Sequence, residues 1–294
     1  MRRTTFITLV LVFLTLTASA QTPQVTPAPS DTASGEKSLD LIKGIKNGDL
    51  VLILKSLDAG ASPNTVEDGT PALTWAVRVN RVDIAEILLA RGANVDAKEG
   101  DDGTPLQTAA VAGQAQMVKL LIKHQANVNH PDHDGHRPLL LTVFGAVFKA
   151  APAWLGDEDD EDLKKLVMGD EHEQVAKLLL DAGAEVNAQA NDCGLTPLMI
   201  AAMAGNVELS QILLKHHPDV NLSNGESTAL DFAEMFDSPE EVQKQMQSFD
   251  TAESTQAMLK WIQLTKNGRQ VVAAMLKAAG AKAAIPNDNS APLL

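Results

Sequence analysis

The chain of 294 residues has one cysteine, Cys193, no tyrosine and only 3% aromatic residues. No internal disulfide can form, so we expect the fold to depend on an apolar core made mainly of Leu, Val, Ala and Ile. We interpret Cys193 as a variable loop residue, with an intermolecular disulfide as the alternative. The sequence also lacks a nucleophile elbow, a phosphate-binding loop, a Gly-rich dinucleotide turn and paired Cys motifs. We therefore expect no enzyme and no cofactor.

Basic residues are also scarce, because 24 Lys and Arg face 38 Asp and Glu, a formal charge of −14. Nucleic acids and anionic membranes bind proteins through clustered cations, so both are poor partners for this chain. An acidic surface favours solubility or a basic protein partner. We expect a monomer that binds a protein.

The N-terminus has the features of an export signal. Arg2 and Arg3 precede a mostly apolar run from Phe6 to Ala18, and Ala18-Ser-Ala20 fits a small-x-small cleavage pattern. We expect residues 1–20 to be a signal peptide, 21–37 a disordered spacer rich in Pro, Thr and Ser, 38–285 one folded domain and 286–294 a disordered tail. The cleaved protein is then exported, periplasmic or secreted, and not inserted in a membrane.

Five pairs of positions twelve residues apart each bracket an apolar helical stretch. Glycine fills most of them, as expected where a helix ends in a left-handed residue. The pairs are Gly48 and Gly60, Asn80 and Gly92, Gly113 and Gln125, Gly205 and His217, and Gly268 and Gly280. One helix-turn-helix unit has therefore been copied along the chain.

A second landmark confirms this spacing. The motifs are Asp-Gly-Thr-Pro-Leu at 102–106, Gly-His-Arg-Pro-Leu at 135–139 and Gly-Leu-Thr-Pro-Leu at 194–198, with degenerate forms at 69–73 and 226–230. They place Pro or Ala at positions 72, 105, 138, 197 and 229, in steps of 33, 33, 59 and 32 residues. Thr104 and Thr196 are expected to cap helices with their hydroxyls, because Pro105 and Pro197 follow at the first helical position, where a missing N–H costs nothing. Each motif therefore starts a helix.

These landmarks resemble the ankyrin-repeat family, whose unit of about 33 residues carries a Thr-Pro-Leu-His signature. The resemblance covers nearly all of residues 39–284 and implies an all-α solenoid of six helix-turn-helix units with β-turn or hairpin fingers. The signature histidine is replaced, so the polar tie between adjacent turns is either absent or rebuilt. The residues at its position are Thr74, Gln107, Leu140, Met199 and Asp231.

Two insertions, about 149–171 and 237–267, interrupt the regular spacing between a first and a second helix. Ser238-Pro-Glu-Glu241 is a capping box, and Met258, Trp261 and Ile262 continue with helical spacing. We expect the second insertion to form one or two helices lying on the stack. It either caps the C-terminal core or docks a partner.

Three patterns invite a metal interpretation. The acidic run of residues 157–162 lacks the Gly and Glu of a calcium loop and favours a helix N-terminus instead. His172-Glu173 lacks the second His of a zinc-protease motif. Residues 130–136 hold three His and two Asp, which we interpret as finger positions at the surface, with zinc as the alternative.

The resemblance places the working surface on the fingers and the exposed face of each first helix, which together form a concave groove. We expect an exported bacterial scaffold that binds a protein there; a secreted effector that engages host proteins, or a metal-binding accessory factor for an envelope enzyme, is the alternative. Phe144, Met203 and Met235 either serve as apolar anchors or pack between units. The expected contact residues are Thr70, Arg78, Val79, Val111, Ala112, His133, His136, Phe144, Leu195, Met203 and Met235.

Overall fold

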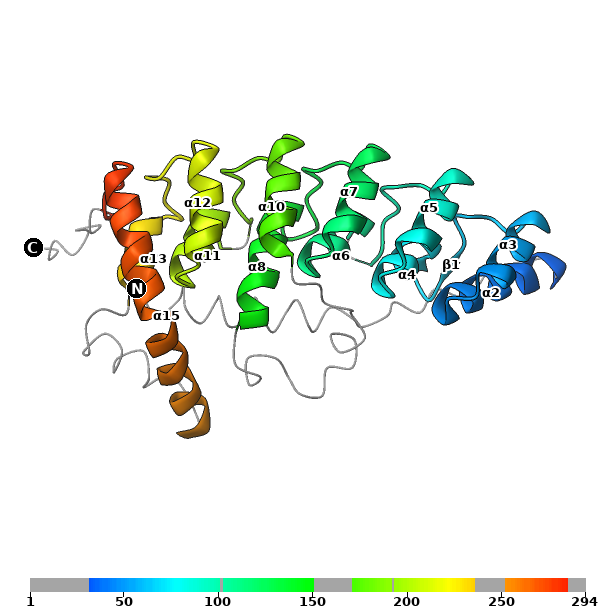
Figure 1. The fold of residues 1–294 in the computed structure, drawn as a ribbon, viewed down its shortest axis with the longest axis horizontal. Coiled ribbons are helices and arrows are strands. Elements are labelled where there is room, and N and C mark those ends of the chain that lie inside the picture. The colour runs from blue at the N-terminus through cyan, green and yellow to red at the C-terminus, as the bar shows by residue number, and fades with distance from the viewer. Residues whose placement is uncertain (1–31, 101–102, 151–170, 192, 236–251, 285–294) are drawn as a thin grey trace, which may run out of the picture. The chain divides into compact units, whose positions relative to one another are not determined.

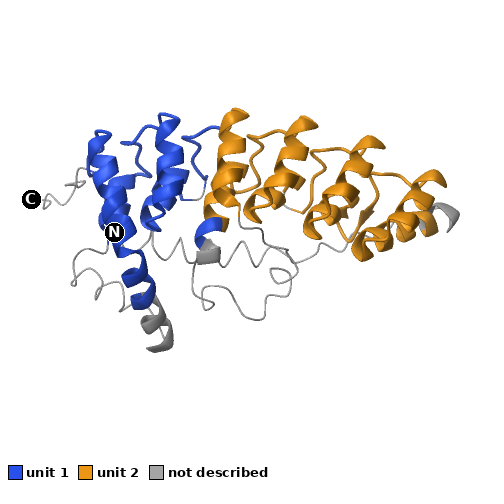
Figure 2. Cartoon of the chain, in the orientation of Figure 1, with its two compact units in different colours: residues 1–14, 146–158, 185–294 blue, residues 15–145, 159–184 orange. Residues whose placement is uncertain are grey.

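The computed structural model describes residues 32–100, 103–150, 171–191, 193–235 and 252–284 (Figure 1). The predicted signal peptide and tail, most of the spacer, the acidic run and the capping box at Ser238 lie outside these residues. Backbone contacts divide the chain into two compact units (Figure 2). One comprises residues 15–145 and 159–184, and the other residues 1–14, 146–158 and 185–294.

Helices in the unit of residues 15–145 and 159–184 form pairs that pack on one another. The helices are α2 (Thr32–Asn47), α3 (Leu50–Asp58), α4 (Ala72–Arg78), α5 (Val82–Ala90), α6 (Pro105–Val111), α7 (Ala115–Lys123), α8 (Pro138–Ala150, which continues into the other unit) and α10 (His172–Asp181). Helix α4 contacts α2, α5 and α6, and α7 contacts α5, α6 and α10. Each pair thus covers the apolar side of the next.

The second unit repeats this arrangement. Its helices are α11 (Pro197–Met203), α12 (Val207–Lys215), α13 (Ala229–Glu234) and α15 (Ala252–Ala278). Helix α11 packs against α12 and α13, while α15 contacts α11, α12 and α13. Counted over the described part of the chain, the helices make six pairs, as the spacing of the landmarks predicts.

Short turns between the pairs form the predicted fingers. Strands β1 (Val66–Glu67) and β2 (Thr70–Pro71) pair antiparallel, with Val66 opposite Pro71. Single bridges join Glu99 to Gly103 and Ser223 to Thr228 in two later fingers. The fold is therefore all-α apart from these turns.

The predicted helix caps are present. The Thr104 hydroxyl accepts the N–H of Gln107 at 3.4 Å, and the Gln107 side-chain oxygen accepts the N–H of Thr104 at 2.8 Å. Thr196 caps α11 in the same way, by accepting the N–H of Met199 at 3.2 Å. Both prolines occupy the first helical turn, so each Thr-Pro motif starts a helix as expected.

Nine of the ten bracketing positions adopt the predicted left-handed conformation, including Gln125 (φ 67°) and His217 (φ 53°). The prediction is wrong for Gly268, which lies inside the continuous helix α15. A Cβ atom at Gly268 would overlap the carbonyl oxygen of Gly205. Glycine therefore serves here for close helix approach and not for a turn. The described part of the second insertion, residues 252–267, is consequently continuous with the last second helix.

The spacer prediction also needs correction at its C-terminal end, because α2 begins at Thr32 and not after residue 37. Leu41, Ile42 and Ile45 bury one side of this helix. Lys37 also donates to the carbonyl of Ala59 at 2.8 Å. The helix extends into the spacer composition because packing further along the same helix stabilises it.

An amide side chain ties each of several repeats to the next turn. In the unit of residues 15–145 and 159–184, Asn64 donates to the Gly92 carbonyl at 3.2 Å and accepts the N–H of Asn94 at 2.6 Å. Asn129 donates to the Gly183 carbonyl at 3.0 Å. Asp96 holds the same position one repeat earlier and accepts the N–H of Asn127 at 3.1 Å. A carboxylate cannot donate, so this repeat lacks half of the tie.

The same tie recurs in the unit of residues 185–294. Asn221 donates to the carbonyl of Gly280 at 3.4 Å and accepts the N–H of Lys282 at 2.8 Å. Asn187 accepts the N–H of Asp219 at 2.9 Å. These bonds satisfy carbonyl and amide groups that a helix end leaves unpaired.

The missing signature histidine is partly replaced by other polar residues. Gln107 donates to the carbonyls of His130 at 3.2 Å and His136 at 2.8 Å, and so joins two turns. Asp231 accepts the N–H of Ala284 at 2.8 Å. The hydroxyl of Thr74 is buried without a hydrogen-bond partner. The polar tie is therefore rebuilt in some repeats and absent in others.

An ion pair between Arg81 and Asp83 lies at the N-terminus of α5. Arg81 donates to Asp83 at 2.6 Å, and this hydrogen bond holds the pKa of the Asp83 carboxyl below its usual value. The pair therefore stabilises the folded state above the ordinary pKa of Asp, and its contribution is lost as the pH falls through the lowered value. Both side chains are well exposed, so the effect is small.

None of the helices that the structure describes is long and apolar enough to span a membrane.

Candidate protein-binding site

Burial divides the eleven predicted contact residues into two groups. Five remain at least partly accessible: Arg78, Val79, Val111, His133 and Met235. The other six are buried: Thr70, Ala112, His136, Phe144, Leu195 and Met203. The predicted surface is thus only partly available to a partner.

The expectation that Phe144 and Met203 are exposed anchors is wrong, and the alternative of internal packing is the one the structure has. Phe144 is 2% exposed, and its ring meets the His136 ring edge-on with centroids 5.9 Å apart. Met203 is 3% exposed and lies on α11, all of whose residues are buried. Substituting Asp for either residue would bury a carboxylate and disturb folding rather than test binding.

One of these accessible residues, Arg78, lies beside Trp75, which is half-buried on α4. The Lys46 ammonium is 4.1 Å from the centroid of the Trp75 ring, and the Arg78 guanidinium carbon is 5.3 Å from it. Cations at these distances are attracted to the electron-rich face of an indole. Trp75 therefore has a cation from α2 and another from its own helix beside its ring.

Two carboxylates from successive fingers neutralise these cations. Glu99 accepts from Arg78 Nη2 at 2.8 Å and from the Thr70 hydroxyl at 2.5 Å. Glu67 pairs with Lys46. We call this set of residues the Trp75 cluster: Lys46, Glu67, Thr70, Trp75, Arg78 and Glu99. It connects the exposed side of α4 with two fingers, which is where the resemblance places the working surface.

Sequence reasoning named only Thr70 and Arg78 of this cluster. A signal for Trp75 was available, because it precedes Arg78 by three residues and Val79 by four, which places all three on one side of a helix. Lys46, Glu67 and Glu99 carry no such signal. They lie 29, 8 and 24 residues from Trp75 in the sequence, and only the stacking of the repeats brings them together.

Two histidines considered for metal binding, His136 and His172, make other contacts. His136 is buried, its Nδ1 lies 3.2 Å from Asp132, and Asp132 also accepts the His136 N–H at 2.8 Å. His172 is buried with its Nε2 3.1 Å from the Val111 carbonyl. In the described ranges, no group of three His, Cys, Asp or Glu side chains could hold a metal ion.

Comparisons with known proteins agree with this architecture. A family model described as "Ankyrin repeats (many copies)" matches residues 73–122 and 163–214. The chain is 28% identical over 232 residues to a zebrafish protein named putative palmitoyltransferase ZDHHC13, a match that covers 74% of this chain and 36% of that protein. It is 32% identical over 145 residues to NF-kappa-B inhibitor cactus of Drosophila yakuba, which covers 48% of this chain and 29% of the relative.

A third match, to chicken inversin, is 34% identical over 99 residues and covers 33% of this chain and 9% of that protein. The chain thus spans little more than a third, or less, of the length of these relatives. What the matches share with the structure is the repeat. The helix pairs, the fingers and the family match together show that this chain carries ankyrin repeats in an all-α solenoid fold, which implies a scaffold for protein–protein interaction.

Proposed function

We propose that this chain is an exported, non-enzymatic scaffold that binds a protein partner through the fingers and the exposed faces of its first helices, with the Trp75 cluster at the centre. The observation that carries the proposal is a half-buried Trp with two cations beside its ring, both of which are paired with finger carboxylates. Trp and Arg are the residues most enriched among the strongest contacts of protein interfaces.

The chemistry of the Trp75 cluster supports recognition over catalysis. The ring offers a large apolar contact, while Arg78 and Glu99 offer a donor and an acceptor whose side chains are 36% and 17% exposed. The Trp75 Nε1 is covered and has no hydrogen-bond partner. A partner carbonyl that reached this N–H would satisfy the donor and recover the cost of leaving it unpaired, about 1–3 kcal/mol.

Affinity capture from an envelope extract tests this proposal. The wild type should retain a protein that Trp75→Ala and Arg78→Ala each release, because both substitutions remove a contact at the centre of the site. Val51→Ala is the matched control, since Val51 is 77% exposed on α3 and lies outside the cluster. Arg78→Ala matters because a half-buried Trp can also contribute to folding. Identical capture by the wild type and both cluster variants contradicts the proposed site.

Export is a separate part of the proposal and rests on residues 1–20 alone. Fractionation of cells that produce the full chain should place the cleaved protein in the periplasm. Protein found only in the medium favours the secreted effector, and uncleaved protein in the cytoplasm contradicts export.

The name of the zebrafish relative raises the question of acyl transfer. The match covers 36% of that relative, so most of its length has no counterpart in the match. We propose that the present chain binds without transferring an acyl group. When the chain is incubated with labelled palmitoyl-CoA and the envelope extract, its presence should add no label to itself or to proteins of the extract. Labelling that depends on the chain contradicts the proposal that it transfers no acyl group.

A further inference from the structure

The outer side of α15 is apolar where the corresponding helices are polar. Three and six residues after the turn glycine or its equivalent, the four internal repeats have Asp83 and Glu86, Gln116 and Lys119, Gln174 and Lys177, and Glu208 and Gln211, all exposed. Helix α15 has Val271 and Ala274 at these positions, also exposed. The first repeat has Val51 and Leu54. Apolar residues at these positions therefore occur in the two terminal repeats.

Helix α15 extends this apolar surface beyond the repeat pattern. Leu264, Val271, Met275 and Ala278 are spaced by 7, 4 and 3 residues, which places them along one side of the helix. Leu264 is 68% exposed and Val271 47%. We call these four residues the α15 strip. At 1.5 Å per residue it is about 21 Å long.

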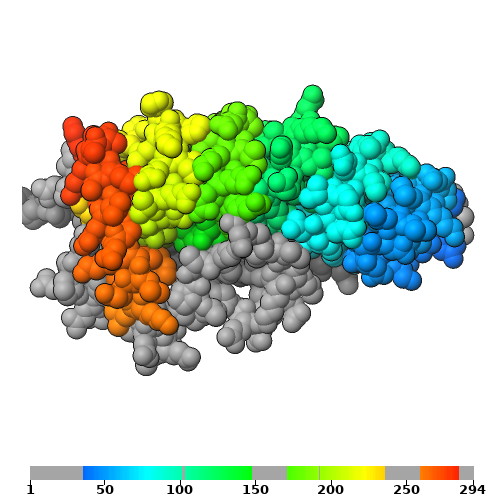
Figure 3. Space-filling model, viewed as in Figure 1, coloured from blue at the N-terminus to red at the C-terminus, as the bar shows by residue number. Residues whose placement is uncertain are grey.

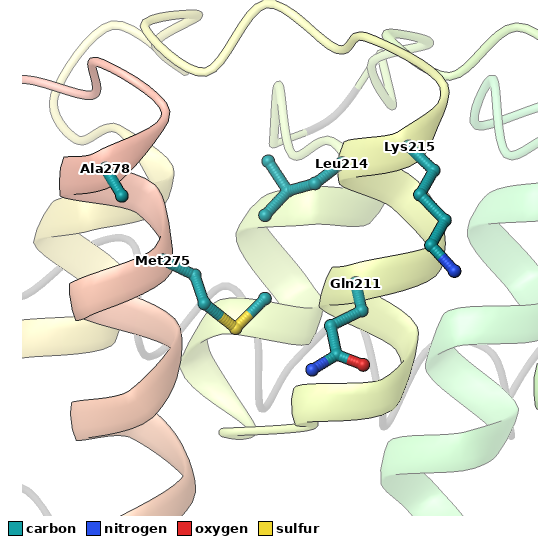
Figure 4. A pocket seen from close by; sticks show the side chains of 5 residues that line it. All are labelled: Gln211, Leu214, Lys215, Met275 and Ala278. Atoms are coloured by element: carbon teal, nitrogen blue, oxygen red, sulfur yellow. The ribbon is translucent and has the colours of Figure 1, made fainter.

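A hollow lies beside the strip, between α12 and α15. It has a volume of about 380 Å³ and is lined by Gln211, Leu214, Lys215, Met275 and Ala278. Leu214 and Met275 point toward each other across it (Figure 4). The strip therefore continues into a concave apolar surface that a convex side chain could enter. Figure 3 shows the two helices that border it, α15 (orange to red) and α12 (yellow), next to each other.

The exposed charges along α15 are basic, although Arg269 is buried and Lys277 pairs with Glu234 at 2.6 Å. Residues 254–284 contain Lys260, Lys266, Arg269, Lys277 and Lys282 but no acidic residue, although acidic residues outnumber basic ones 38 to 24 overall. Lys260 extends the strip at one end, and Lys215 borders the hollow at the other; both are exposed. The first repeat differs, because Asp49, Lys55 and Asp58 give α3 both signs of charge.

We propose that the α15 strip and its hollow form a second docking surface that binds an acidic amphipathic helix of a protein partner. The partner's apolar side would cover Leu264, Val271 and Met275, and its carboxylates would pair with Lys260 and Lys215. An amphipathic helix laid into an apolar groove is a recurrent mode of recognition. The surface is separate from the Trp75 cluster, so the proposal goes beyond the function proposed above.

Two other occupants fit the surface less well. An anionic lipid surface would attract the lysines of α15, but the net charge of −14 opposes the approach of the whole chain. A second copy would place two basic α15 surfaces together if the contact were symmetric, which like charges disfavour. Both become outcomes of the test.

The test measures fluorescence anisotropy of a labelled 14-residue peptide made of two copies of Leu-Glu-Glu-Leu-Leu-Glu-Glu. The full chain should bind it more tightly than the same peptide with every Glu replaced by Lys. The double variant Leu264→Asp, Val271→Asp should bind at least tenfold more weakly. Lys215→Glu with Lys260→Glu should weaken binding and reduce its dependence on salt. Val51→Asp is the matched control and should bind like the wild type.

Several results overturn the proposal. Equal binding of the acidic and basic peptides, no binding of either, or unchanged binding by the Leu264→Asp, Val271→Asp variant removes the surface as a site for an acidic helix. If the chain sediments with phosphatidylglycerol vesicles but does not bind the peptide, the α15 strip is assigned to lipid binding. If the wild type is a dimer and the Leu264→Asp, Val271→Asp variant is a monomer, the α15 strip is assigned to self-association. Trp75→Ala should leave peptide binding unchanged, so failure here is distinct from failure of the proposed function.

Discussion

Two exposed residues in the structure carry a backbone conformation that suits glycine. Gln125 and His217 end α7 and α12 with φ of 67° and 53°. We predict that Gln125→Gly and His217→Gly each raise the free energy of unfolding, by up to about 1 kcal/mol, because glycine avoids the steric cost of this region. Urea titration and thermal unfolding measure the change. Asn80→Gly is the control and should gain less stability, since Asn tolerates this conformation better than Gln or His. Unchanged or lower stability of both Gln125→Gly and His217→Gly contradicts the left-handed conformation assigned to these residues.

The incomplete tie at Asp96 offers a second stabilising change. Asn64 and Asn129 each donate to the carbonyl of the left-handed residue in the next repeat, which Asp96 cannot do. We predict that Asp96→Asn adds a bond to the Gln125 carbonyl and about 0.5–1.5 kcal/mol of stability. The reverse change, Asn129→Asp, should lose a similar amount. Equal stability of Asp96→Asn and wild type in urea indicates that the amide does not reach this carbonyl.

At this scale the sequence predicted what depends on neighbours in the chain. The caps at Thr104 and Thr196 follow from Thr-Pro motifs, and the left-handed turns follow from glycine spacing. The burial of Phe144 and Met203 was not predictable, because the ring or helix that covers each lies elsewhere in the fold. Trp75 was missed for a similar reason: its helical spacing was visible, but most of its charged neighbours come from α2 and two fingers.

Among the elements, α15 shows how one residue type can serve two purposes. Gly268 has the spacing of a turn but lies within a helix, against Gly205. The spacing of apolar residues predicted helices on both sides of it. It could not show that they join, because that depends on how closely α15 approaches the preceding repeat.

We predict that Gly268→Ala lowers stability by about 1–3 kcal/mol even though Ala favours helices, because its Cβ has no room beside the Gly205 carbonyl. Thermal unfolding followed by circular dichroism measures the loss. Ala274→Gly, at an exposed position of the same helix, should cost about 1 kcal/mol through propensity alone. A more stable Gly268→Ala protein would mean that α15 and the turn at Gly205 are not in contact.

For the whole molecule, we propose that the N-terminal segment determines the compartment in which the scaffold works. We predict that export removes residues 1–20, so the mature protein begins at Gln21. Intact-mass measurement of protein recovered from the periplasm tests the cleavage site. Ala20→Arg should block processing and retain the longer form, because a small residue is required there. Export of full-length protein contradicts a cleaved signal.

The contacts of α4 and α5 have a consequence for how such a chain can change in length. Apart from packing on each other, α4 packs on α2 of the pair before it and on α6 of the pair after it, and α5 packs on α7. Pro71 and Thr104 occupy the same position in successive repeats, so excising one repeat of 33 residues, 71–103, would join two helix-pair surfaces of the same kind. Gene duplication or loss can therefore lengthen or shorten this protein by whole modules, and redesign of its recognition surface can follow the same route.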